Sequence, residues 1–224
     1  MIPIFIGYDP NESVAFHTCS SSIIRNTSEP VAIIPLALNL LNNYKEVHND
    51  GSNTFTYTRF LVPYLTKYFG HAIFLDGDML VLDDIVNLWN MRSNNYAVQV
   101  VKHNYKTKSK IKYLNNHNAD YPKKNWSSVM IWNCSHAKNK FLTPISIAES
   151  TGEILHRFTW LNEDEVGDLP LEWNWLSDEY GTNEDAKLIH YTLGIPDFKQ
   201  FSNVVYSDLW EKEKIFVNYC KQYD

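Results

Sequence analysis

Short apolar runs alternate with stretches of helical spacing along much of this chain, and this alternation restricts the fold more than any other feature. The runs have the length and residue types of buried strands. They cover Ile2–Ile6, Val31–Leu38, Ala72–Leu75, Tyr96–Val101 and Val129–Trp132. Helices are predicted at Glu12–Arg25 with Asn11 as cap, at Tyr57–Phe69, and from Asp83-Asp84 through Trp89. Strands that alternate with helices predict an α/β domain with a mostly parallel sheet.

The length and continuity of the chain favour one domain. Its 224 residues suit a single core, and no repeat and no linker rich in proline, glycine or serine divides them. The second half is less regular, so we expect mixed strands and long loops there. One part of it, Lys102–Lys124, contains seven lysines. We interpret this lysine-rich segment either as a solvated surface loop or as a flap over an anionic substrate, forming a wall of its site.

Charge and cysteine content argue against several classes of protein. A formal net charge of -6 disfavours general binding of nucleic acid, which requires a basic surface. Cys19, Cys134 and Cys220 lie far apart with no Cys-x-x-Cys pair, which disfavours a disulfide framework and a structural zinc site. We find no apolar stretch long enough for a transmembrane segment, and Met1–Ile6 is predicted to be a strand rather than part of a signal peptide. These features predict a soluble cytoplasmic protein.

The sharpest motif is a pair of carboxylates directly after an apolar strand. Asp76 and Asp78 follow the run Ile73–Leu75, with Gly77 between them. In an extended chain residues i and i+2 point to the same side, so both carboxylates can face one ligand, and the glycine permits its close approach. Ligands of open α/β sheets bind beyond the carboxyl ends of the strands. Two hard oxygen ligands at such a place are typical of an Mg²⁺ or Mn²⁺ site beside substrate phosphates.

The alternative interpretation of this pair is an exposed turn that binds no metal, because Asp-x-Asp is a common pattern. Apolar residues on both sides of the motif argue against that alternative, since buried carboxylates without partners would be costly. A cation held by Asp76 and Asp78 would act as a Lewis acid and neutralise the charge that grows on a departing diphosphate.

Leu75-Asp76-Gly77-Asp78 resembles the Asp-x-Asp motif of GT-A glycosyltransferases, in particular family 8, which contains glycogenin and bacterial galactosyltransferases. Other segments resemble this family in the same order, and the resemblance covers about residues 2–198. These segments are Phe5–Asp9, Tyr57–Phe60, Trp126–Asn133 and Leu188–Gly194. Leu169–Trp175 is similar to the Leu-Pro-x-x-Trp-Asn-Trp of small viral and bacterial glycosyltransferase domains.

The resemblance implies a GT-A fold: α/β, with a Rossmann-like nucleotide-binding half, a mixed, mainly parallel central sheet and helices on both faces. In a single domain of residues 1–224, the nucleotide-binding half would cover about residues 1–100 and the acceptor-side half about residues 101–224. The implied activity is transfer of a sugar from a nucleotide diphosphate donor, a UDP-sugar, to a carbohydrate or glycoconjugate hydroxyl, with Mn²⁺ or Mg²⁺ on the diphosphate. The resemblance leaves open whether the chain is one domain of a larger glycosyltransferase.

The resemblance also assigns individual residues. It makes Asp76, Asp78 and His190 the metal ligands, since neutral imidazole suits Mn²⁺, although a lone histidine after a strand is more often structural. Arg59 would be catalytic, neutralising the diphosphate or orienting the sugar, unless it forms only a surface salt bridge. The residues that it places at the nucleotide are Gly7, Tyr8, Asp9, Arg59, Leu75, Asp76, Gly77, Asp78 and Gly194. Within that set Tyr8 would stack on the uracil beside Asp9, or both would only form a turn.

Two positions depart from the family pattern. Pro196 stands where the family often has a lysine on the diphosphate, six residues after the metal histidine, so the backbone around Gly194 or Lys199 would have to substitute. Trp126, with Asn125 beside it, stands where relatives have an asparagine that contacts the sugar. The identity of the donor sugar therefore stays open.

A carboxylate near the donor sugar is predicted just before the tryptophan-rich segment. By resemblance, Asp164 or Glu165 would be the general base of an inverting enzyme, or would stabilise the cation-like sugar in a retaining one. The alternative for these residues is a charged helix start. Trp173 and Trp175 are candidates for an acceptor platform or for the core.

Two rival classes remain from the sequence. A haloacid-dehalogenase-like Mg²⁺-dependent phosphotransferase also has a strand followed by Asp-x-Asp, but its motif usually lies near the chain start and continues as Gly-Thr, whereas Met79-Leu80 follows here. A catalytically inactive carbohydrate-binding domain is the non-enzymatic alternative. The intact set of Asp76, Asp78 and His190 argues against it.

Overall fold

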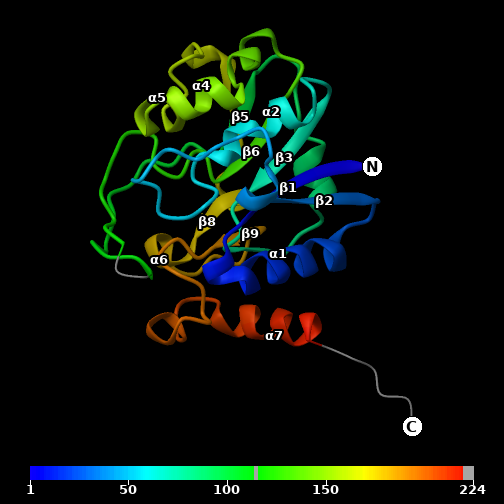
Figure 1. The fold of residues 1–224 in the computed structure, drawn as a ribbon. Helices are drawn as coiled ribbons and strands as arrows, with labels where there is room; N and C mark the ends of the chain where they lie inside the picture. The colour runs from blue at the N-terminus through cyan, green and yellow to red at the C-terminus, as the bar shows by residue number, and fades with distance from the viewer. Residues whose placement is uncertain (114–115, 219–224) are drawn as a thin grey trace.

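A six-stranded sheet forms the centre of the computed structural model, which describes residues 1–113 and 116–218 (Figure 1). The strand order is β2-β1-β3-β6-β5-β7. The strands are β1 Ile2–Tyr8, β2 Val31–Ala37, β3 His71–Leu75, β5 Val98–Val100, β6 Val129–Asn133 and β7 Val166–Asp168. β1 runs parallel to β2 and β3, and β7 runs parallel to β5, while β6 lies antiparallel between β3 and β5. The predicted α/β fold with a mixed, mainly parallel sheet is confirmed.

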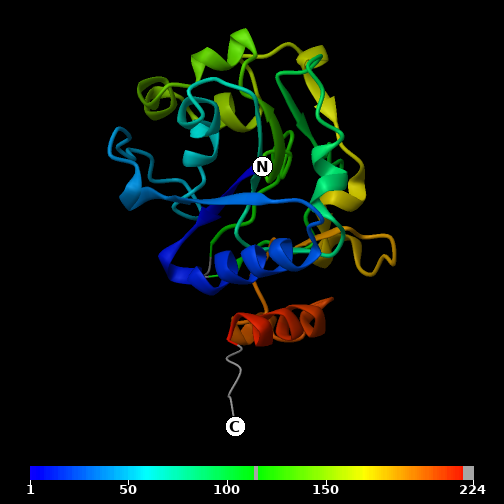
Figure 2. The same ribbon diagram turned by 90° about the vertical axis from the view of Figure 1, so that its right-hand side faces the viewer.

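Helices cover both faces of this sheet, as predicted (Figure 2). On one side lies α1, against which α7 packs, and on the other side lie the short helices α2, α4 and α5. Of two further short helices, α6 lies beside the smaller sheet described below, and α3 contributes buried residues to the core beneath α1. The bounds are α1 Ser13–Asn26, α2 Val62–Leu65, α3 Ile85–Trp89, α4 Pro144–Glu149, α5 Gly152–His156, α6 Ser177–Tyr180 and α7 Ser207–Val217.

Alternate residues of the central strands enter two different cores. In β1, Ile4 and Ile6 pack into the core beneath α1, whereas Phe5 belongs to the core on the opposite face. In β3, Ile73 and Phe74 divide in the same way. A strand that is buried on both faces reads as an unbroken apolar run, which explains why the sequence predicts these strands well.

A second, three-stranded sheet continues from the end of β3. Its order is β4-β9-β8, and β9 is antiparallel to β4 and parallel to β8. The strands are β4 Met79–Val81, β8 Trp175–Leu176 and β9 Leu188–His190. Asp76–Asp78 is the whole connection between β3 and β4. Its backbone is held at both ends, because the Asp76 N–H donates to the Ser128 carbonyl at 3.0 Å and the Asp78 carbonyl accepts from the Tyr191 N–H at 3.0 Å.

The helix predicted over Tyr57–Phe69 is shorter and interrupted in the structure. A 3₁₀ turn at Thr58–Leu61 leads into the single turn of α2, and Pro63 occupies the first turn of that helix, where its missing N–H costs nothing. Lys67 and Tyr68 then take φ values of 56° and 55°, which end the helical path before Gly70. The break matters because the 3₁₀ turn carries Arg59.

The N-terminal ends of two predicted helices are close to their expected places. α1 begins at Ser13, after a 3₁₀ turn in which Asp9, rather than the predicted Asn11, supplies the cap: its Oδ1 accepts from the Asn11 N–H at 2.9 Å. Asp84 caps α3, since its Oδ1 accepts from the Val86 N–H at 2.9 Å. Aspartate side chains therefore begin the 3₁₀ turn that precedes α1 and begin α3 itself.

The structure also bears on the cysteines and on possible membrane-spanning segments. Cys19 and Cys134 are buried free thiols, and Cys220 lies outside the described residues. Among residues 1–113 and 116–218, no helix combines the length and the apolar character needed to cross a bilayer.

Candidate functional site

Asp76, Asp78 and His190 form a buried cluster at the junction of the two sheets. One ligand atom from each, a carboxylate oxygen or a ring nitrogen, lies within 4.8 Å of the others. His190 is the last residue of β9 and pairs with Met79, the first residue of β4. The antiparallel pairing of these strands therefore places a histidine beside two acidic residues that are distant in sequence. The structure thus brings together the three residues that the sequence predicts as metal ligands.

Hydrogen bonding of His190 leaves one of its ring nitrogens free. Its Nδ1 lies 2.9 Å from Oδ1 of Asn174, whose Nδ2 donates to the carbonyl of Asn125 at 3.2 Å. Because that carbonyl can only accept, Asn174 presents its oxygen to His190, and Nδ1 carries the ring proton. Nε2 then has an available lone pair. A metal-binding histidine is usually held in this way, with its second nitrogen donating to a protein acceptor.

The free nitrogen faces both carboxylates. Nε2 of His190 lies 3.2 Å from Oδ1 of Asp78 and 3.8 Å from Oδ2 of Asp76. Oδ1 of Asp78 is buried and accepts no hydrogen bond from residues 1–113 or 116–218. Lone pairs that face each other at this separation repel unless a proton or a metal cation lies between them. The donor set of two carboxylates and one imidazole therefore fits a divalent cation such as Mn²⁺ or Mg²⁺.

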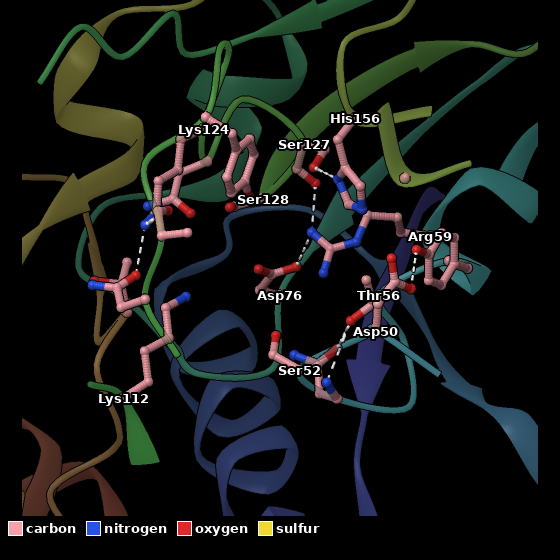
Figure 3. Close-up of a pocket in the computed structure, with 18 of the residues that line it drawn as sticks. Asp50, Ser52, Thr56, Arg59, Asp76, Lys112, Lys124, Ser127, Ser128 and His156 are labelled. Carbon is pink, nitrogen blue, oxygen red and sulfur yellow. Dashed lines mark hydrogen bonds and ion pairs between the residues drawn. The ribbon is translucent and has the colours of Figure 1, made fainter. Parts of the chain in front are cut away.

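Arg59 is tied to this cluster rather than to the protein surface. Its Nη1 lies 2.8 Å from Oδ1 of Asp76 and also donates to the carbonyl of Ser127 at 3.0 Å (Figure 3). Its Nε donates to the carbonyl of Phe55 at 3.3 Å. The side chain is only 5% exposed, so the surface salt bridge considered for it is not what forms. Arg59 instead fixes the position and charge of Asp76.

The two carboxylates of the cluster differ in their affinity for protons. Burial raises the pKa of Asp76 to about 6, against the opposing charge of Arg59, and Asp78 adds to the increase. Burial also acts to raise the pKa of Asp78, but the positive charge that His190 carries when protonated outweighs it, and the pKa of Asp78 lies below its ordinary value. A cation bound by this cluster would favour the charged form of both groups.

A cavity of about 640 Å³ opens beside the cluster and is large enough for a nucleotide sugar (Figure 3). Asp76, Asp78, His190 and Arg59 line it together with residues of the loop before the 3₁₀ turn and of helix α5. The lysine-rich segment supplies another wall, so it is not simply a solvated loop. Its lining residues are Lys112, Tyr113, His117, Asn118, Ala119, Tyr121 and Lys124.

The predicted nucleotide residues at the end of β1 lie next to the junction but do not line this cavity. A Cβ on Gly77 would lie 2.5 Å from the carbonyl oxygen of Gly7, so the first strand and the junction can approach this closely only with a glycine. Tyr8 packs edge-on against Phe16. Asp9 is buried, and besides capping the 3₁₀ turn it accepts from the Thr54 N–H at 2.8 Å. These contacts position the loop before Arg59. Leu75, also predicted at the nucleotide, is buried in β3.

The segment after β9 does not offer its predicted substitutes for a lysine. Gly194 and Lys199 are both absent from the cavity lining, although Thr192 is part of it. Gly194 has a φ of 151°, and a Cβ there would lie 2.4 Å from the ring of Phe201. The glycine is therefore explained by close packing of this turn against the chain that follows.

The structure does not bring Asp164 and Glu165 to the cavity. Both lie in the 3₁₀ turn Glu163–Glu165, and Asp164 is exposed. The carboxylate of Glu165 accepts from the N–H of Asn162 at 2.7 Å and pairs with Nζ of Lys138 at 2.6 Å. This arrangement is a capping box, the charged helix start that is the alternative interpretation of these residues.

Neither tryptophan of the Leu169–Trp175 segment lines the cavity. Trp173 is fully buried in the core beneath α1, and Trp175 donates from its indole N–H to the Gly181 carbonyl at 2.8 Å. Of the neighbours Asn125 and Trp126, it is Asn125 that lines the cavity. Both tryptophans of the segment are thus explained by packing.

Sequence reasoning does not identify several residues that support the site. Asn174 carried a signal, since it lies in the Trp-Asn-Trp segment, but its hydrogen bond to His190 depends on tertiary structure. Ser127 lies in the Trp126–Asn133 segment, but no local signal shows that its carbonyl accepts from Arg59 or that its Oγ lies 2.8 Å from Nδ1 of His156. Glu12 carries no signal in the sequence, and burial together with Asp78 raises its pKa to about 9.

Comparison with known proteins gives information on the family and the fold of this chain. A family model described as "Glycosyl transferase family 8" matches residues 8–199. "Protein CDI" of Arabidopsis thaliana is 38% identical over 219 residues, which cover 94% of this chain and 85% of that protein.

Solved structures of glycosyltransferases share the fold. The galactosyltransferase LgtC, in complex with donor and acceptor sugar analogs, has a TM-score of 0.58 at 11% identity, over 99% of this chain and 98% of that one. GlyE of Streptococcus pneumoniae TIGR4 has a TM-score of 0.61 at 14% identity, over 97% of this chain and 62% of that one. The bifunctional glycosyltransferase WbbM has a TM-score of 0.59 at 18% identity, over 95% of this chain. This chain spans 49% of the WbbM chain.

Proposed function

Because this chain belongs to glycosyl transferase family 8, we propose that it transfers a sugar from a UDP-sugar to a hydroxyl of a carbohydrate or glycoconjugate acceptor. Family membership supports glycosyl transfer, and the Asp76, Asp78 and His190 cluster supports dependence on Mn²⁺ or Mg²⁺. The observation that carries the proposal is the free Nε2 of His190, which faces two carboxylates at the edge of a cavity large enough for the donor.

In this proposal the protein's own residues prepare the cluster before substrate arrives. Asn174 holds His190 in the tautomer whose Nε2 can bind a metal, and Arg59 holds Asp76 in its charged form. The chemistry that Mn²⁺ or Mg²⁺ would supply is neutralisation of the charge that develops on the departing diphosphate. Both supporting contacts are buried, so they cost little reorganisation during the reaction.

The general base, which would take the proton from the acceptor hydroxyl, is distinct from the proposed metal ligands. An inverting reaction needs a carboxylate within reach of the acceptor hydroxyl. Apart from Asp76 and Asp78, the acidic residues that line the cavity are Asp50 and Glu153. Asp50 already accepts from the hydroxyl of Tyr57 at 2.5 Å. The cavity therefore favours these two positions over Asp164 and Glu165 in a search for the base.

Calorimetric titration of UDP tests the proposal, with and without Mn²⁺. We expect UDP binding to depend on Mn²⁺, and Asp78→Asn to weaken it by about 100-fold or more, because a charged ligand of the metal is lost without a change in shape. Asp164→Asn removes an exposed carboxylate outside the cavity and serves as the matched control, with wild-type affinity expected. Equal affinity of Asp78→Asn and wild type for UDP in Mn²⁺ would contradict the metal site.

Turnover assays separate the proposed enzyme from its rivals. A glycosyltransferase is expected to hydrolyse one member of a panel of UDP-sugars slowly in the presence of Mn²⁺, and a carbohydrate-binding domain is expected to hydrolyse none. A haloacid-dehalogenase-like phosphotransferase would instead cleave a generic phosphoester, an activity that the family membership argues against. A cytoplasmic location stays a prediction from the cysteine content.

A further inference from the structure

Four cationic side chains line the cavity, and three of them already have protein partners. They are Arg59, Lys112, Lys124 and Arg157. Arg59 is bound to Asp76 at 2.8 Å, and Arg157 pairs with Glu153 one helical turn away. Nζ of Lys124 donates to Oδ1 of Asn118 at 2.6 Å and to the carbonyl of Ala119 at 2.7 Å. These three cationic groups are therefore engaged with partners in the protein.

Lys112 differs from the other three. Within residues 1–113 and 116–218 its ammonium group forms no ion pair and no hydrogen bond, and Figure 3 shows it pointing into the cavity. Lys112 lines the same cavity as Asp76, Asp78 and His190. Burial lowers the pKa of Lys112, while the charges of Asp78 and Asp76 act to raise it. In the same view, Lys112 and Arg59 approach Asp76 from opposite sides.

The backbone around Lys112 is fixed although it belongs to a long loop. The Lys112 N–H donates to the Asn116 carbonyl at 2.8 Å, and the Tyr113 N–H donates to the Leu193 carbonyl at 2.6 Å. The Tyr113 hydroxyl donates to the Ser52 carbonyl at 3.3 Å. This stretch of the loop is therefore pinned to the chain just after His190 and to Ser52, which also lines the cavity.

Charge balance indicates what Lys112 faces. With a divalent cation bound, the two carboxylates and Arg59 leave the cluster with one net positive charge. The diphosphate of a nucleotide sugar carries two negative charges, and a third develops as the sugar leaves. One more cation is needed to balance the bound donor, and Lys112 is the side chain in position to provide it.

We propose that Lys112 binds the diphosphate of the nucleotide donor, opposite Arg59 across the metal-ligand cluster, an assignment that rests on the proposed function. It gives this role to one lysine of the lysine-rich segment, and four of the others have different surroundings. Lys124 braces the loop from within, and Lys102 and Lys123 pair with carboxylates elsewhere. Lys110 is exposed and does not line the cavity.

Binding of UDP and of uridine in Mn²⁺ tests this role, because uridine has no phosphate. Lys112→Met is expected to weaken UDP binding by about 10-fold to 100-fold and to leave uridine binding, followed by ligand-observed NMR, unchanged. Lys110→Met, in the same loop, is expected to bind both as wild type does. Lys112→Arg keeps the charge and is expected to recover most of the UDP affinity, which separates a role in binding from a loss of fold.

The outcomes distinguish this inference from the function on which it rests. If Asp78→Asn loses UDP binding while Lys112→Met retains it, Lys112 does not bind the diphosphate and the proposed function stands. Parallel losses of UDP and uridine in Lys112→Met, without recovery in Lys112→Arg, would also overturn the inference, since they indicate a structural role. If wild type binds UDP equally with and without Mn²⁺, both the proposed function and this inference fail.

Discussion

Two walls of the same cavity are built in different ways. The first, here called the strand corner, consists of Asp76, Asp78 and His190, which sit where two sheets meet and are held by Arg59 and Asn174. The second is the lysine-rich segment, whose described residues, 102–113 and 116–124, form little regular structure and are held by scattered backbone hydrogen bonds and by Lys124.

The difference separates fixed chemistry from adjustable recognition. Charged groups in the strand corner are positioned by strand pairing and by buried partners, so their geometry is set before a ligand arrives. Side chains on the loop wall are positioned by fewer contacts, and loops tolerate change better than strands do. The corner is suited to holding a metal, whereas the loop wall is suited to selecting what lies next to it.

Apart from substitution of the proposed metal ligands, the strongest test of this contrast is a substitution of Asn174. This residue orients His190 but does not line the cavity. Asn174→Leu removes the oxygen that orients His190 and is expected to weaken Mn²⁺ binding by about 10-fold to 100-fold. Asn174→Asp keeps an acceptor for Nδ1 and is expected to lose much less. Electron paramagnetic resonance of free Mn²⁺ measures both. Equal affinities in wild type and Asn174→Leu would show that the hydrogen bond does not prepare the site.

A second prediction concerns the free energy of unfolding at acidic pH. It depends on the buried His156, which contacts Ser127 next to the strand corner. Burial lowers the pKa of His156 to about 3, with Arg59 acting in the same direction. The unfolded chain protonates this histidine below about pH 6.5, whereas the folded chain does so only near pH 3. The unfolded state therefore binds more protons between these values, and stability falls as the pH falls through this window.

The free energy of unfolding from urea titrations between pH 7 and pH 4 measures this effect. His156 is expected to contribute a slope of up to about 1.4 kcal/mol per pH unit below pH 6.5. His156→Gln cannot titrate, so its curve should be flatter than that of wild type by this amount. An unchanged slope in His156→Gln would mean that His156 is protonated in the folded state or that another group dominates.

The smallest expected effect concerns the loop wall. Lys124→Met removes two hydrogen bonds from Asn118 and Ala119, and we expect a loss of about 1–2 kcal/mol in stability and a rise of a few-fold in the KM for the donor. The exposed Lys106→Met is the matched control and should change neither. Affinity for Mn²⁺ alone should stay at the wild-type value in both variants. A large loss of Mn²⁺ affinity in Lys124→Met would show that the two walls are not independent.

The sequence predicted the strand corner better than the loop wall, for physical reasons. Strands buried on both faces leave an apolar signature, so β1, β3 and β6 were expected close to their observed bounds. The Asp76–Asp78 motif was visible because it directly follows such a strand. His190, however, joined it only through the family resemblance, because pairing of β4 with β9 leaves no local signal in the sequence.

Contacts between distant loops could not be predicted. Asp164 and Glu165 had the right chemistry for a base, yet the carboxylate of Glu165 caps its own turn and pairs with Lys138. Lys112 was one of seven lysines, with no local feature to distinguish it. Only the folded structure shows that Lys124 is used internally while the ammonium of Lys112 points into the cavity.

The central claim, that Asp76, Asp78 and His190 hold a divalent metal against a nucleotide diphosphate, is tested most directly by anomalous diffraction. Crystals grown with Mn²⁺ and UDP are measured on both sides of the manganese absorption edge. We expect one strong anomalous peak coordinated by the carboxylates of Asp76 and Asp78, by Nε2 of His190 and by diphosphate oxygens. Bound UDP with no manganese at this position, or with manganese at another, would contradict the account.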